Sequence, residues 1–129
     1  MAPTSLGPPP ITWVNVPAKL TNAELDRTIQ ELEGYLRRER PYILLFDLGK
    51  TLPDAMQRKK LTEHMRKNEA AILRWLVGLG VVVPSAVARN VVTAILWFAP
   101  PKVPHGIFGD RAEAEAWASA LQTKAATPP

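Results

Sequence analysis

The stretch "YILLFDLG", residues 42–49, is an almost continuous run of apolar side chains. A strand that faces water on one side alternates polar and apolar residues, whereas a short run without alternation is typical of a central strand buried on both faces. Sheets with two covered faces belong to α/β proteins, in which helices connect parallel strands. This run therefore favours an α/β fold with a largely parallel sheet.

Three further short apolar runs extend the pattern. Together the four runs predict strands at residues 11–16, 42–49, 76–84 and 106–110. Segments with helical spacing follow each strand, and their starts are expected at Thr21, Asp54, Ser85 and Asp110. Strands that alternate with helices give the order β-α-β-α-β-α-β-α and a four-stranded, mostly parallel sheet.

The domain organisation follows from length and composition. A chain of 129 residues suits one domain with one hydrophobic core, which we place at residues 11–122. The proline-rich residues 1–10 and the residues 123–129 are expected to be disordered tails.

Composition argues against several classes of function. The chain has no cysteine, so disulfides and thiol chemistry are absent. His64 and His105 lie far apart without ligand spacing, and neither a Ser-His-Asp order nor a glycine-rich phosphate loop is present. We therefore predict a non-catalytic protein with no metal and no cofactor.

Two features bear on the cellular location. The N-terminus lacks the basic start and the apolar segment of a signal peptide, so we expect a cytoplasmic protein. Residues 76–99 are apolar enough to suggest a membrane span, but Pro84, Ser85 and Arg89 interrupt them near their centre. A strand followed by a helix fits this window better.

Several motifs resemble a known family. "LTNAEL", "YILLFDL", "VVVPSAVAR", "ILWFAPP" and "PHGIFGDRAEAEAW" occur in this order, with a long basic helix before the third. Over about residues 11–121 the chain resembles the SpoIIAA-like branch of the STAS superfamily, small bacterial domains related to anti-sigma-factor antagonists, whose general shape the CRAL-TRIO lipid-binding fold shares. The most recognisable positions are Phe108, Asp110, Ala114 and Trp117. The resemblance implies a regulatory domain that binds other proteins.

The chain departs from that family at its regulatory serine. STAS antagonists carry a phosphorylated serine at the start of the helix after the matching strand, but the residues 54–57 contain neither this serine nor its glycine. Thr51 is an alternative acceptor, although a helix-start cap is the favoured role for it. For Asp47 we favour a loop-fixing role, in which it accepts backbone N–H bonds. The candidate ligand or switch loop comprises Asp47, Lys50, Thr51 and Asp54.

The helix at residues 86–98 carries a single charge, Arg89, and its faces can be sorted by spacing. One stripe, expected to face the sheet, comprises Val87, Val91, Val92, Ile95 and Phe98. The other, expected to face outward, ends in Trp97, and a large exposed aromatic residue is typical of a contact surface. The alternative is that Trp97 folds under the proline-rich turn as part of the core. The predicted interface comprises Arg89, Asn90, Thr93, Trp97, Pro100, Pro101 and His105.

The second helix, expected as one long helix over about residues 53–75, carries a basic surface. Its members are Arg58, Lys59, Lys60, Arg66 and Lys67. A solvated face is the favoured role, because Glu63 and Glu69 interrupt the charge and no aromatic residue is interleaved. We therefore predict no nucleic-acid binding. With a net charge of +4, an acidic partner or peripheral contact with an anionic membrane stays open.

Two functions follow from different features. The first is a protein-interaction domain of STAS type that binds an unidentified protein partner or a second copy of itself, forming a homodimer, through residues 86–98 and the proline turn. The alternative is a carrier of a small hydrophobic ligand or lipid, with a pocket between that helix and the sheet. A carrier requires an apolar cavity of several hundred Å³.

Overall fold

Four parallel strands form a single sheet in the order β1-β2-β3-β4, so every connection leads to the neighbouring strand. The computed structural model describes residues 8–49, 51, 53–98 and 101–126, without the side chains of 95–98 and 126. Its elements are β1 (Ile11–Asn15), α1 (Asn22–Arg37), β2 (Tyr42–Asp47), α2 (Ala55–Lys67), α3 (Glu69–Trp75), β3 (Leu76–Val82), α4 (Ala86–Phe98), β4 (His105–Phe108) and α5 (Arg111–Ala126). The predicted α/β fold with a parallel four-stranded sheet is confirmed.

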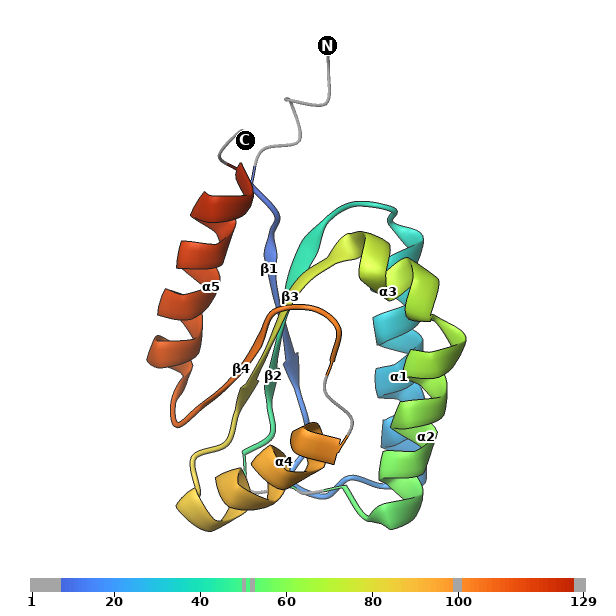
Figure 1. Cartoon of the computed structure of the whole chain (residues 1–129). Coiled ribbons are helices and arrows are strands. Elements are labelled where there is room, and N and C mark those ends of the chain that lie inside the picture. The colour runs from blue at the N-terminus through green and yellow to red at the C-terminus, as the bar shows by residue number, and fades with distance from the viewer. Residues whose placement is uncertain (1–7, 50, 52, 99–100, 127–129) are drawn as a thin grey trace.

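The helices divide between the two faces and one end of the sheet. In Figure 1, α1, α2 and α3 cover one face and α5 covers the opposite face. Helix α4 crosses the end of the sheet at which the strands finish, where Val92 packs against Val81 and Val83.

The α5 face of the sheet is closely packed. Ile43, Leu45 and Val82 point toward Ala114 and Ala118, and all five are at most 1% exposed. A methyl group on Gly78 or Gly80 of β3 would run into side chains that include Trp117 and Leu121 of α5. The strand glycines therefore allow α5 to lie directly on the backbone of the sheet.

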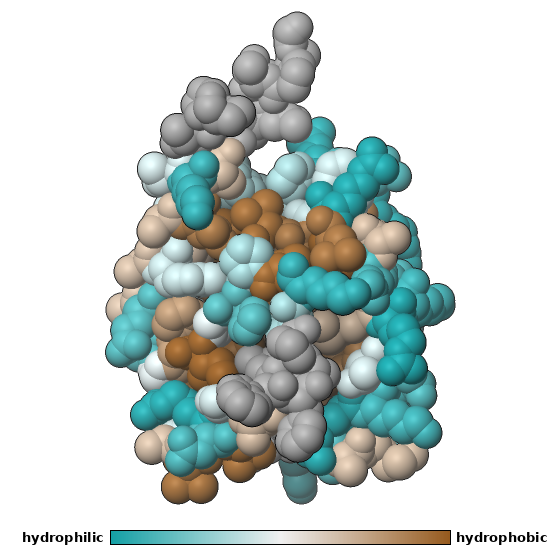
Figure 2. Space-filling model, in the orientation of Figure 1, coloured by the Kyte–Doolittle hydropathy of each residue, from teal (hydrophilic) through white to brown (hydrophobic). Residues whose placement is uncertain are grey.

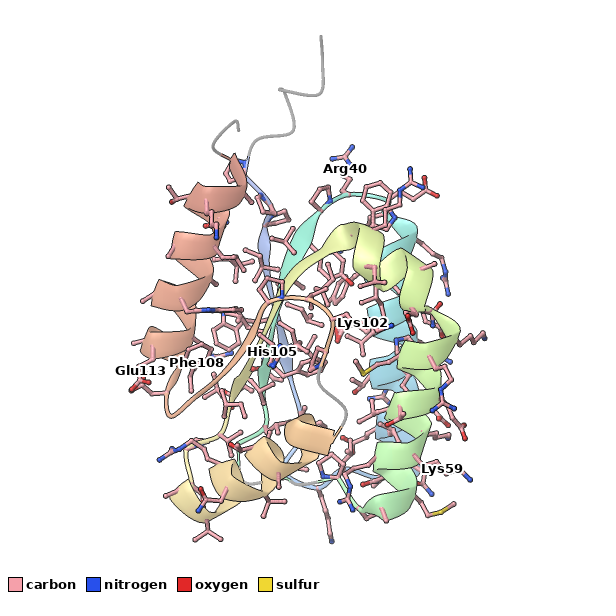
Figure 3. All side chains as sticks on the ribbon, viewed as in Figure 1. Arg40, Lys59, Lys102, His105, Phe108 and Glu113 are labelled. Atoms are coloured by element: carbon pink, nitrogen blue, oxygen red, sulfur yellow. The ribbon has the colours of Figure 1, made fainter. Side chains whose placement is uncertain are left out.

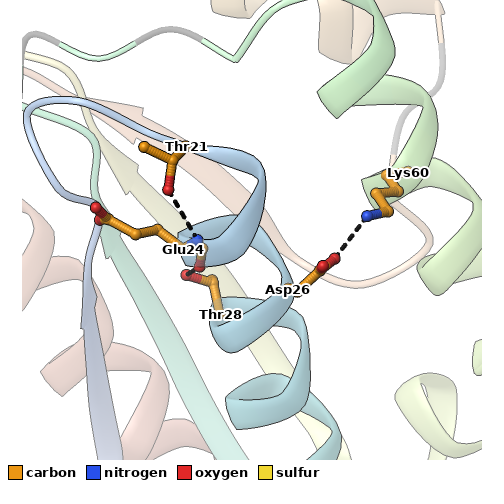
Figure 4. Close-up of polar contacts among 5 residues, drawn as sticks. All are labelled: Thr21, Glu24, Asp26, Thr28 and Lys60. Atoms are coloured by element: carbon orange, nitrogen blue, oxygen red, sulfur yellow. Dashed lines mark hydrogen bonds and ion pairs between the residues drawn. The ribbon is translucent and has the colours of Figure 1, made fainter.

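The opposite face is built around α1. Its buried residues Leu32 and Leu36 pack against Val14 and Leu44 of the sheet. Two polar contacts fasten α2 beside α1. Lys60 forms an ion pair with Asp26 of α1 at 2.6 Å (Figure 4), and the side chain of Gln57 donates a hydrogen bond to the carbonyl of Leu20, which precedes α1.

Helix starts lie where the sequence places them. The Thr21 hydroxyl accepts the Glu24 backbone N–H at 3.1 Å (Figure 4). Asp54 and Gln57 form a reciprocal capping box at the start of α2. Ser85 and Asp110 accept backbone N–H groups at the starts of α4 and α5. Each bond satisfies a donor that the helix itself leaves unpaired.

The single helix expected from Asp54 to about residue 75 is wrong, because it divides into α2 and α3 at Asn68. The Asn68 side chain donates a hydrogen bond to the His64 carbonyl at 3.0 Å. Asparagine competes with the backbone for such bonds, and this competition ends a helix.

Parts of the two segments expected to be disordered tails are bonded to the domain or form part of a helix. The Pro10 carbonyl accepts a bond from the Ile43 N–H, and the Pro9 carbonyl accepts one from Gln122. Helix α5 continues to Ala126, four residues beyond the expected domain boundary at 122. Residues 1–7 and 127–129 lie outside the described residues.

Residues 76–98 form a strand and then a helix of 13 residues, as the sequence predicted. Within the described part of the chain, no helix has both the length and the hydrophobicity that a membrane span requires.

The close packing of the α5 face is testable at Gly80, where an added methyl group would lie 2.5 Å from Leu45 of β2 and 3.3 Å from Trp117 of α5. We expect Gly80→Ala to lower the free energy of unfolding by about 1–3 kcal/mol, because the methyl group overpacks the layer. Urea denaturation measures this change. Gly34→Ala in α1 is the control, since nothing lies within 4 Å of the added methyl there. It should leave stability unchanged or raise it by up to about 1 kcal/mol. A Gly80→Ala protein as stable as the wild type would contradict this description.

Candidate functional site

A cavity of about 440 Å³ lies on the face of the sheet that α1, α2 and α3 cover. Its floor is formed by alternate residues of the two central strands, Leu44 and Phe46 of β2 and Leu79 and Val81 of β3. Alternate residues of a strand share one face, which is why these four side chains point into the same space.

The remaining wall comes from helices and from the segment after α4. It is largely apolar. Its apolar members include Leu25, Leu32 and Leu36 of α1, Leu61 and Met65 of α2, Ile72 and Leu73 of α3, Val92 of α4, and Pro101 and Val103. Protein interiors contain few voids larger than a water molecule, so an apolar space of this size has the dimensions of a ligand site.

Exposed members of the lining mark the mouth of the cavity. They are Thr62, Met65, Arg66, Glu69, Leu73 and Lys102. Lys102 forms an ion pair with Glu69 at 2.7 Å, which links the segment after α4 to the start of α3. Figure 3 shows Lys102 between the sheet and the helices α1 and α2, with Lys59 on the outer side of α2. The mouth thus lies between α2–α3 and the segment after α4.

Burial favours the neutral form of two polar side chains in the wall, His64 and Tyr42. Burial lowers the pKa of His64 from 6.5; Glu33 opposes this shift and Lys67 adds to it. The His64 ring also lies within hydrogen-bond distance of the Asn68 amide, at 3.2 Å. Burial, followed by the neighbouring Tyr35, raises the pKa of Tyr42 to about 12. Neither group adds charge to the cavity at neutral pH.

The orientation predicted for the helix at residues 86–98 is right for Val92 and wrong for Val87 and Val91, and the side chains of Ile95 and Phe98 lie outside the described residues. Val87 and Val91 were expected to face the sheet, but they are 75% and 41% exposed, and Val92 is the buried valine. The reason is that α4 crosses the strand ends, where Ala88 and Val92, among the side chains described for this helix, contact the core formed by Val81 and Val83. The cavity accordingly lies beneath α1–α3, and α4 contributes Val92 to the described lining.

The described members of the predicted interface do not form one patch. Arg89 donates hydrogen bonds to the carbonyls of Val83 and Pro84, which fastens α4 to the end of β3. The Thr93 hydroxyl donates to the Arg89 carbonyl, and Asn90 is exposed.

The other members of that interface lie elsewhere. Pro101 lines the cavity. His105 begins β4, about 13 Å along the strand from the end near Arg89, and its ring lies 3.0 Å from the Val103 carbonyl. Pro100 and the side chain of Trp97 lie outside the described residues.

The polar side chains described in the predicted switch loop form hydrogen bonds and an ion pair within the protein. Asp47 accepts the Gly49 backbone N–H at 3.0 Å, as predicted, and forms an ion pair with Arg111 at 3.2 Å. The Thr51 hydroxyl donates to the Pro17 carbonyl at 2.6 Å. Thr51 is therefore not a helix-start cap, because Asp54 holds that position. Lys50 lies outside the described residues.

The five residues of the predicted basic surface do not all lie on the same side of α2. Lys60 is paired with Asp26, and Lys59 and Lys67 are exposed. Arg58 and Arg66 instead line the cavity. Sequence spacing groups these five residues by charge alone and does not separate the two that border an apolar space.

The sequence placed the expected pocket between the helix at residues 86–98 and the sheet, whereas most of the wall of the observed cavity comes from α1, α2 and α3. Leu61, Met65 and Ile72 have the spacing of a buried stripe, yet Met65 is 40% exposed and all three line the cavity. The same apolar side chains surround a packed core and a void, so no sequence signal distinguishes the two. Within the described residues, no three histidine or carboxylate side chains gather closely enough to hold a metal ion.

No protein-family model, no curated protein and no solved structure matches this chain. Arguments about function therefore depend on the geometry of the cavity and of α4.

The burial of His64 has a consequence for stability. Its pKa is lower in the folded chain than in the unfolded chain, so its contribution is fully present above pH 6.5 and is lost as the pH falls below that value. We expect the free energy of unfolding to decrease between pH 7.5 and pH 5.5 (about the range in which histidine titrates). His64→Gln should reduce this dependence. Urea denaturation at both pH values provides the measurement, and an identical pH dependence in both proteins would refute the assignment.

Proposed function

We propose that this protein binds and carries a small apolar ligand in the cavity beneath α1–α3. The observation that supports this proposal is the contrast between the two faces of one sheet. On the α5 face the packing is so close that β3 requires glycine at two positions, whereas the other face leaves about 440 Å³ open.

Physical chemistry favours an apolar ligand over bound water. A water molecule in a protein cavity needs two to four polar partners, and the floor formed by Leu44, Phe46, Leu79 and Val81 offers none. An apolar ligand would replace lost contacts and remove its own surface from water. The mouth beside Met65 and Leu73 provides an entry path.

Neighbouring residues of β3 provide a direct test of the cavity. Val81 points into the cavity and Val82 points into the packed α5 layer. We expect Val81→Phe to change the free energy of unfolding by less than about 1 kcal/mol and Val82→Phe to lower it by about 1–3 kcal/mol. Val81→Phe should also weaken binding of the neutral dye N-phenyl-1-naphthylamine at least about tenfold. Dye fluorescence and urea denaturation give the two readouts.

Val87→Ser is the matched control for binding, because Val87 is exposed on α4 and does not line the cavity. It should bind the dye like the wild type. If the wild-type protein shows no saturable binding, the carrier function is refuted. If Val81→Phe and Val82→Phe destabilise the chain equally, both faces are packed and the cavity is absent in solution.

As a second function, we propose a STAS-like interaction domain that associates with a second copy of itself through α4. The supporting observation is that Val87 and Val91 of α4 are 75% and 41% exposed. Figure 2 shows apolar atoms at the lower end of the molecule, among more polar ones. The exposed residues described on α4 carry no charge, and Arg89 is bonded to backbone carbonyls. Two copies related by a two-fold axis could pack these faces without bringing like charges together.

The dimer is tested by changing both exposed valines of α4. If α4 is the interface, the wild-type protein should sediment as a dimer and the Val87→Ser, Val91→Ser double variant as a monomer. Both positions are at the surface, so the free energy of unfolding of the isolated monomer should change by less than about 0.5 kcal/mol per substitution. A wild-type chain that sediments as a monomer at every concentration would rule out the dimer and would leave the carrier function intact.

A further inference from the structure

The charged members of the cavity lining are unequal in number. The described lining contains the cations Arg58, Arg66 and Lys102 and a single carboxylate, Glu69. Glu69 already forms an ion pair with Lys102 at 2.7 Å. The two arginines therefore have no acidic partner within the lining, and the apolar space has a net positive border.

The two arginines differ in depth and in bonding. Arg58 is half-buried, and one of its amino groups donates a hydrogen bond to the Pro53 carbonyl at 2.8 Å. Arg66 is exposed at the mouth, and within the described part of the chain its guanidinium makes no hydrogen bond or ion pair. A guanidinium group offers five N–H donors in a planar fork that fits a carboxylate or a phosphate.

We propose that the ligand is a single-chain amphiphile with an anionic head group, a carboxylate or a phosphate monoester. Its head lies at the mouth on Arg66, and its apolar chain lies on the floor formed by Leu44, Phe46, Leu79 and Val81. Arg58, deeper in the wall, adds positive potential of the same sign. This inference rests on the proposed carrier function and specifies the chemical class of the ligand.

The position of Arg66 suits this role. It lies on the same helix as Leu61 and Met65, which continue the apolar wall inward, so one ligand can contact both kinds of side chain. Glu69 is close in sequence, but its carboxylate is engaged by Lys102 and leaves the Arg66 guanidinium available for a ligand. Charge-assisted bonds of this type are stronger than neutral ones.

The test compares ligands that share a chain and differ in the head. Tetradecanoate, tetradecyl phosphate and tetradecanol are titrated into the full chain at low salt, below their aggregation concentrations, with displacement of N-phenyl-1-naphthylamine as the readout. We expect at least one of the two anions to bind about tenfold more tightly than the alcohol. Comparison of the titrations with tetradecanoate and tetradecyl phosphate identifies which head group the protein prefers. High salt should reduce the difference.

Variants on α2 locate the head group. Arg66→Gln should lower the affinity for the preferred anion to that of the alcohol and leave the affinity for the alcohol unchanged. Lys59→Gln removes the same charge from the outer side of α2 (Figure 3) and should have little effect. Because Arg66 is exposed and makes no contact that the fold requires, the variant should melt like the wild type.

Three outcomes would overturn the inference. Equal affinity of the wild type for the alcohol and both anions shows that the head group is not recognised, while the carrier function stands. If Arg66→Gln and Lys59→Gln lower the affinity for the anion equally, the net charge of the protein, and not the Arg66 side chain at the mouth, attracts the ligand. Failure of the dye and of every ligand to bind refutes the carrier function itself, and this inference with it.

Discussion

The contact between α5 and the backbone of β3 is the constraint on which the rest of the structure depends. Because Gly78 and Gly80 have no side chains, Trp117 and Leu121 lie directly on the sheet. Ile43, Leu45 and Val82 complete this layer, and they are among the most deeply buried large side chains described. One face of the sheet is thus rigidly packed, which gives the other face a stable floor.

The opposite face of the sheet is less closely packed, because α4 crosses the ends of the strands. In a sheet whose strands follow one another in order, each connection must return along the sheet before the next strand begins. The connection between β3 and β4 places its helix across the strand ends, so α1, α2 and α3 provide most of the cover on that face, and Val92 of α4 and Val103 complete it (Figure 1). Their side chains do not fill the space above Phe46 and Val81, and the cavity results.

Local chemistry made much of the fold predictable. Apolar runs identified the strands, and capping side chains such as Thr21, Ser85 and Asp110 identified the helix starts, because both signals act over a few residues. The break at Asn68 was missed, since an asparagine within a helical pattern ends the helix only when its side chain turns back to the backbone. The exposure of Val87 and Val91 was missed because spacing defines the stripes of a helix and not the element that a stripe meets.

By itself, the sequence determined the class of the fold, the alternation of strands with helical segments, the starts of α1, α2, α4 and α5 and the loop-fixing bond of Asp47, because these signals act over a few neighbouring residues. Only the tertiary structure decided which face is packed and which is open. It also decided that Arg58 and Arg66 border the cavity while Lys59 and Lys60 do not. The physical reason is that a void is defined by distances between side chains far apart in the chain. Those distances depend on how helices are placed on the sheet, and residue type alone does not specify them.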